Sequence, residues 1–163
     1  MRKYLICIGC AIALFIVGLS VHRAFIDTSL SILQFENVLL STSGMSQVIK
    51  TRIHFAFVLA AIPILVLISQ LYLRKNSIKR SLLTTMSILL GGFIAWQLRI
   101  QFIQQAIKDL TDDTLNYNFD GVSMITFSSL MFELYLFVGF VSGAFLVVSI
   151  LAWKQKWQQI KAA

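Results

Sequence analysis

The sequence predicts an all-α membrane protein with four transmembrane helices in an antiparallel bundle. Three observations carry this prediction. Apolar residues make up 58% of the 163 residues and charged residues only 13%, whereas about a quarter of the residues in soluble domains are charged. Four apolar runs reach the roughly 20 residues needed to cross the hydrocarbon of a bilayer. Apolar and polar residues do not alternate within these runs, which excludes a transmembrane β-barrel.

The predicted spans cover residues 4–22, 53–73, 81–103 and 124–153, and the longer loops cover 23–52 and 104–123. No remaining segment is long enough to build a core of its own, so residues 1–163 are expected to form a single membrane domain. Pro63 lies in the middle of the second span. Neighbouring helices can satisfy the carbonyl that a proline frees, so we expect a kink at Pro63 and not a helix end.

The first span also has features of a cleavable signal peptide. Arg2 and Lys3 form a basic start, and the small residues Gly18 and Ser20 have a spacing that suits cleavage. The apolar run is longer than the 7–15 residues of a usual signal sequence, and it continues through Val21 without a break. We therefore expect this segment to stay in place as the first transmembrane helix.

Basic residues predict the orientation of the chain. The two termini and the short loop between the second and third spans carry nine Lys and Arg and no acid, whereas the two longer loops carry four basic and six acidic residues. Cytoplasmic segments are enriched in Lys and Arg, so both termini are expected in the cytoplasm of a bacterial inner membrane. The net charge of +7 is thereby explained by topology, and we expect no nucleic-acid partner.

The first long loop carries an amphipathic pattern. Apolar residues recur at helical spacing along Ile26, Leu30 and Leu33 and along Ile32, Phe35 and Leu39. This spacing predicts a helix at the membrane interface, which ends at residues 41–44. The second long loop is acidic.

Two charged residues fall inside predicted spans, Arg99 in the third and Glu133 in the fourth. A charge in a span costs at least about 2.5 kcal/mol on insertion scales, so such residues mark candidate sites. Their opposite signs and similar depth predict an ion pair between the two helices. The structural alternative is that Arg99 extends to the lipid headgroups and Glu133 is neutral. Nearby polar residues complete a candidate intramembrane binding cluster: Gln97, Gln101 and His54.

His22 and His54 lie at similar depth at the two ends of the first long loop. Paired imidazoles on neighbouring helices can ligate a b-type haem, so a redox subunit that holds haem or quinone is one alternative function. The matched depth also follows from connectivity alone. Cys7 and Cys10 have dithiol spacing, but no charged neighbour activates them, and we interpret them as small packing residues.

Gly139 and Gly143 form a GxxxG motif in the fourth span. This motif lets two helices approach closely and predicts a packing face. The sequence lacks the motifs of serine hydrolases, zinc proteases, nucleotide hydrolases and intramembrane aspartyl proteases, so we do not expect an enzyme. A small transporter or channel component, in which Glu133 titrates, is a second alternative.

The layout resembles that of the inner-membrane immunity proteins that neutralise pore-forming colicins. The resemblance lies in the chain length, the four spans, the cytoplasmic termini, the long first loop that ends in polar residues 41–43, and the basic loop between Arg74 and Arg80. It implies recognition of a toxin's membrane-inserting helices by the spans and outer loops. We therefore expect a non-enzymatic protein that acts through helix and loop contacts, as a complex subunit or as an immunity or exclusion factor, with the lipid bilayer and other membrane proteins as partners.

Overall fold

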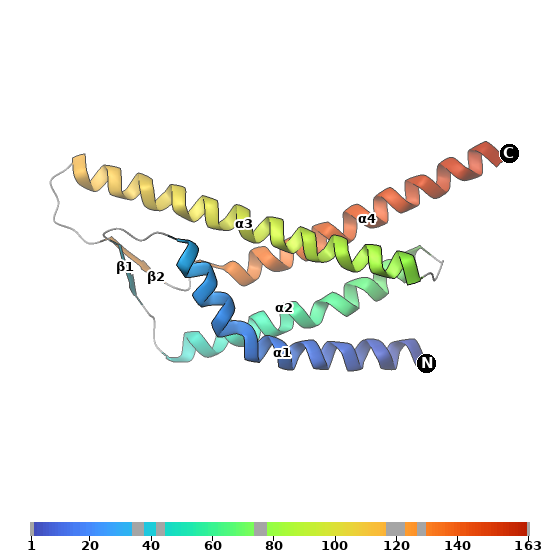
Figure 1. Ribbon diagram of the computed structural model, residues 1–163, viewed down its shortest axis with the longest axis horizontal. Coiled ribbons are helices and arrows are strands. Elements are labelled where there is room, and N and C mark those ends of the chain that lie inside the picture. Colours follow the sequence, from blue (N-terminus) through green and yellow to red (C-terminus); the bar gives the residue numbers. More distant parts are fainter. Residues whose placement is uncertain are drawn as a thin grey trace.

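The computed structural model describes the backbone of residues 2–33, 38–41, 45–73, 78–116, 123–126 and 130–162. The helices in these ranges are α1 (Arg2–Ile32), α2 (Met45–Tyr72), α3 (Ile78–Asn116) and α4 (Phe132–Ala162). They pack as a bundle, and both termini lie at the same end (Figure 1). Each of these four helices is long and apolar enough to cross a membrane. The all-α class with four candidate spans is thus confirmed, and it indicates a multi-pass membrane protein.

Two short strands lie at the end of the bundle opposite the termini, which we call the strand end (Figure 1). They are β1 (Val38–Ser41) and β2 (Ser123–Thr126), which pair in parallel with Val38 opposite Ser123. The expected amphipathic helix through Leu39 is wrong, because α1 ends at Ile32 and Leu39 lies in β1. Pairing with β2 satisfies the backbone N–H and C=O groups of β1. The helical spacing of the apolar residues could not reveal this pairing.

All four helices differ in their limits from the expected spans. α1 continues past residue 22 to Ile32, and α2 begins at Met45 and not at residue 53. α3 continues past residue 103 to Asn116, and α4 begins at Phe132 and not near residue 124. The start of α4 follows Met131, whose φ of 48° is unusual for a residue with a side chain. The Met131 carbonyl accepts hydrogen bonds from the amides of Leu134 and Tyr135, at 3.1 and 3.3 Å. Met131 therefore forms the N-terminal cap of α4.

The helices form two pairs, in which α1 packs along α2 and α3 packs along α4. The pairs meet mainly through α2 and α4. α3 and α4 cross in an X, and the C-terminal half of α4 diverges from α1 and α2 (Figure 1). The bundle is therefore more tightly joined at the strand end and its middle than at the end with the termini.

Small residues set the crossing of α3 and α4. A Cβ atom added to Gly139 would lie 2.7 Å from the Cβ of Ala95 and would also collide with the Gly91 carbonyl. A Cβ atom on Gly143 would collide with the carbonyl of Ser87, whose hydroxyl donates a 2.9 Å hydrogen bond to the Gly143 carbonyl. The GxxxG face thus lies against α3, where small residues permit backbone contact.

α1 and α2 also meet at small residues. A Cβ atom on Gly18 would lie 2.7 Å from the Cα of Ala56. Nearby, Arg52 Nε donates a 2.7 Å hydrogen bond to the Leu19 carbonyl, which links the helices a second time. α2 is helical through Pro63, in agreement with a proline that does not end the span.

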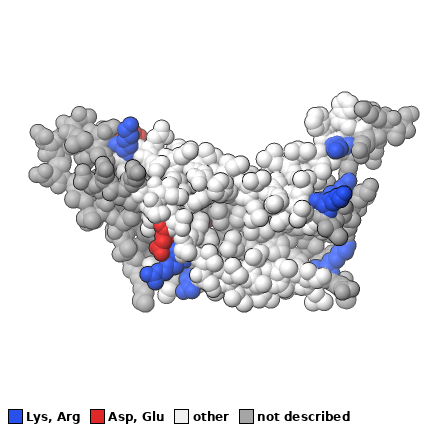
Figure 2. Space-filling model, in the orientation of Figure 1, with Lys and Arg blue, Asp and Glu red and all other residues white. Residues whose placement is uncertain are grey.

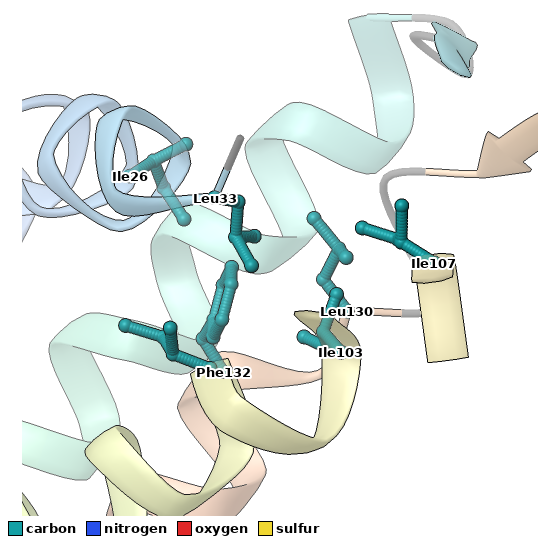
Figure 3. Close-up of a cluster of buried hydrophobic side chains, with 7 residues drawn as sticks. Ile26, Leu33, Ile103, Ile107, Leu130 and Phe132 are labelled. Carbon is teal, nitrogen blue, oxygen red and sulfur yellow. The ribbon is translucent and has the colours of Figure 1, made fainter. Parts of the chain in front are cut away.

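A buried apolar cluster joins α1 to α3 and α4 at the strand end. In Figure 3, side chains from these helices converge. Ile100 and Phe132 are fully covered, at 1% exposure each. The cluster consists of Ile26, Leu33, Ile100, Ile103, Ile107, Leu130 and Phe132. It brings the last turns of α1 and the first turn of α4 together, and this positions the polar residues described next.

Candidate functional site

Each helix contributes one ionisable residue to a polar cluster near the strand end. His22 comes from α1, His54 from α2, Arg99 from α3 and Glu133 from α4. His22 is buried, Arg99 and Glu133 are half-buried and His54 is exposed. The helix packing therefore brings together residues that lie more than a hundred positions apart in the chain.

The most enclosed contact of this cluster joins α1 to α4. His22 Nε2 lies 3.7 Å from Glu133 Oε1, and the two side chains are only 6% and 13% exposed. This separation is too long for a hydrogen bond. Within the described residues His22 Nε2 has no hydrogen-bond partner, and its ring packs edge-on against Phe55, with centroids 5.5 Å apart. The contact therefore links α1 to α4 without a hydrogen bond to His22 Nε2 from the described part of the chain.

Arg99 supports the start of α4. Its Nε donates a 2.9 Å hydrogen bond to the Leu130 carbonyl, and its guanidinium lies over the Tyr135 ring at 4.6 Å from the centroid. Both contacts flank Met131, whose left-handed backbone conformation costs of order 1 kcal/mol or more. Arg99 thereby helps to fix the position of Glu133, which lies two residues after Met131.

The sequence predicted that Glu133 and Arg99 pair with each other. In the structure Glu133 faces His22, and Arg99 contacts the backbone and ring on either side of Glu133. Gln97 is half-buried and Gln101 is exposed on α3. The sequence suggested His22 only as a haem ligand. Its approach to Glu133 could not be predicted, because this contact depends on how α1 lies across α4.

The geometry does not fit a haem held by His22 and His54. The Nε2 atom of His22 faces the Glu133 carboxylate, so a carboxylate occupies the direction in which an iron would bind. His22 packs on Phe55, and the next residue on a helix points about 100° away, so His54 faces a different side of α2.

A groove of about 590 Å³ opens between α2 and α4 beside this cluster. Lys50, Thr51 and His54 line it from α2, and Glu133 lines it from α4. The rest of its wall is mainly apolar and includes Phe57, Leu134 and Phe137. A pocket of this size with a few polar groups on apolar walls is typical of small-ligand sites.

Further contacts that the sequence did not reveal tie α1 to the other helices. Trp96 Nε1 donates a 3.0 Å hydrogen bond to the buried Ser29 hydroxyl, and Phe25 stacks on Phe55 at 4.7 Å. Gln104 Nε2 donates to the Ile32 carbonyl at 3.1 Å, in the last turn of α1. The only signal of these contacts in the sequence was the presence of polar and aromatic residues in the outer turns of apolar helices.

The remaining predicted residues lie away from the cluster. Gly139 and Gly143 are covered by α3, so this face is not free for a partner protein. Cys7 and Cys10 are free thiols near the start of α1, and Pro63 is half-buried. All three of these last residues line a second pocket, between α1, α2 and α3.

The charges of the described residues gather at the two ends of the bundle. On the face shown in Figure 2, blue atoms lie towards both ends and red atoms only towards the strand end, and the broad band between the ends is uncharged. Such a band is what a bilayer core requires, because charged groups at its centre are strongly disfavoured. The polar cluster lies at the edge of this band, at the strand end.

Comparison with protein-family models, curated proteins and solved structures finds no match for this chain. The polar cluster, the groove and the uncovered helix faces are therefore the features from which a function can be argued.

Proposed function

We propose that this chain is a non-enzymatic protein of a bacterial inner membrane that acts by packing α1 against a helix of another membrane protein. The partner is either a subunit of a stable complex or a toxin that has inserted into the membrane. The chain then works as an accessory subunit in the first case and as an immunity or exclusion factor in the second.

The observation that carries this proposal is the surroundings of Gly9 in α1. Five other glycines in the described helices each have an atom of a second helix within 3 Å of the position that a Cβ would occupy, whereas a Cβ on Gly9 would meet nothing within 4 Å. Ala13, one turn further along the same face, is exposed. A small residue at each of these two positions lets a second helix approach closely.

The packing of α1 supports the same view. In an apolar stretch of 18 residues of α1, only 6% are buried within the chain, compared with 33% in the corresponding stretch of α4. Glycine weakens a helix by about 1 kcal/mol relative to alanine in water and gives a lipid-facing helix no packing advantage in return. A helix of another protein at this face would supply that advantage.

The proposed orientation follows from charge. Lys3, Lys79, Arg80 and Lys154 lie at the end of the bundle that holds both termini, and that end is basic and free of acids in the sequence. The positive-inside rule places it in the cytoplasm. The Gly9 face then lies in the cytoplasmic half of the membrane, and the polar cluster in the outer half.

The test compares Gly9→Leu with Val21→Leu, a control at an exposed position of the same helix that lies about 120° around the helix from Gly9. Each variant is produced in the native host and purified in mild detergent, and membrane proteins that co-purify are quantified. In parallel, cells that produce each variant are challenged with a pore-forming toxin whose gene lies beside the gene for this chain. Circular dichroism verifies that both variants keep their helices.

A resident partner should co-purify in fixed stoichiometry with the wild type and with Val21→Leu and be lost from Gly9→Leu. For an immunity factor, protection from the toxin should follow the same order. If Gly9→Leu changes neither the co-purifying proteins nor the protection, α1 faces lipid and the proposal fails.

A further inference from the structure

The groove between α2 and α4 is lined by basic groups on one wall and by an acidic group on the other. Lys50 and His54 lie on its α2 wall and Glu133 on its α4 wall. Within the described part of the chain, Lys50 and His54 make no hydrogen bond or ion pair, and the contact of Glu133 is the 3.7 Å approach to His22. Ionisable groups at a membrane site normally pair with one another or with a ligand. Here the three groups share one groove without a bond between the walls.

The groove is polar at one end and apolar at the other. Lys50 precedes Phe57 by seven residues of α2, a rise of about 10 Å, and Glu133 precedes Phe137 by four residues of α4, a rise of about 6 Å. The polar groups therefore lie nearest the strand end, and the aromatic rings lie deeper in the apolar band. An amphiphilic molecule parallel to the helices would match this order.

We infer that the groove binds a phospholipid whose headgroup carries both a phosphate and a primary ammonium, as in phosphatidylethanolamine. Lys50 and His54 donate hydrogen bonds to the phosphate, and Glu133 accepts hydrogen bonds from the ammonium. The acyl chains lie along Phe57, Leu134 and Phe137.

The charges favour this headgroup over simpler ones. An anionic headgroup would satisfy Lys50 and His54 and leave the Glu133 carboxylate against a like charge, whereas a simple amine would leave Lys50 against a like charge. A trimethylated ammonium has no N–H group to offer to the carboxylate. His22, on the buried side of Glu133, approaches this carboxylate at 3.7 Å and limits its movement, which positions it for the ammonium.

The test uses the full chain in detergent, with lipids added singly: phosphatidylethanolamine, phosphatidylcholine or phosphatidylglycerol. Binding is measured by native mass spectrometry and by the shift in thermal midpoint. The variants are Lys50→Gln and Glu133→Gln, and Lys108→Gln is the matched control, because Lys108 is an exposed lysine of α3 outside the groove.

We expect one phosphatidylethanolamine to bind per chain, with an affinity at least about tenfold higher than that of the other two lipids. Lys50→Gln and Glu133→Gln should each lower this affinity about tenfold, and Lys108→Gln should leave it unchanged. Should Glu133→Gln fail to fold, Lys50→Gln decides the question. Equal binding of phosphatidylglycerol or phosphatidylcholine to the wild type overturns the assignment, and so does unchanged binding in Lys50→Gln.

Discussion

Replacement of Gly139 by alanine should separate α3 from α4. The added Cβ would lie 2.7 Å from the Cβ of Ala95 and 2.7 Å from the Cα of Gly92, and ordinary contact begins at 3.4 Å. The helices must therefore move apart by at least about 0.7 Å at this point, and further to clear the Gly91 carbonyl, since none of these neighbours is the end of a flexible side chain. Overpacking of this kind costs about 1–3 kcal/mol. The shift would also stretch the hydrogen bond between Ser87 and the Gly143 carbonyl.

The assay is unfolding in mixed micelles with increasing dodecyl sulfate, followed by circular dichroism. Gly9→Ala provides the control, because the same substitution at Gly9 meets nothing within 4 Å. It should leave the free energy of unfolding unchanged or raise it, since alanine is the better helix former. The crossing of α3 and α4 would be refuted if Gly139→Ala proved as stable as Gly9→Ala.

Two further predictions concern the contacts that hold the strand end together. Trp96→Phe removes the hydrogen bond to the Ser29 hydroxyl and should lower the free energy of unfolding by about 0.5–1.5 kcal/mol. The control Trp153→Phe, at an exposed position, should leave the free energy of unfolding unchanged. Equal effects of the two variants would count against the hydrogen bond. Arg99→Gln removes the guanidinium from the Leu130 carbonyl and should speed hydrogen exchange at the first amides of α4 without changing exchange in the middle of α4. Unchanged exchange at the start of α4 would contradict the role given to Arg99.

The spans were predictable because each carries its own signal. An apolar run of bilayer length forms a helix in lipid whatever its neighbours are, since a helix satisfies all the backbone groups within the segment itself. The ends of the helices were less predictable. Val38–Ser41 is extended because it pairs with Ser123–Thr126, which is distant in sequence, and the helical spacing of Leu39 could not report that contact.

The candidate site was predictable only in part. Arg99 and Glu133 were found because charged residues in apolar runs are conspicuous, but their contacts were not. Glu133 faces His22 because α1 is drawn over the start of α4 by the cluster around Ile26 and Phe132. Depth within a span can be counted along the chain, whereas direction around the bundle depends on how the helices cross.

The sequence by itself determined that this chain forms four apolar helices with its charges at the ends, because hydropathy and charge act locally and need no partner. Only the tertiary structure decided which small residues contact another helix of the bundle and which do not. Gly139 and Gly143 contact α3, whereas a Cβ on Gly9 would meet nothing within 4 Å. The sequence does not distinguish these glycines. Whether a glycine contacts a second helix depends on the angles at which the helices pack.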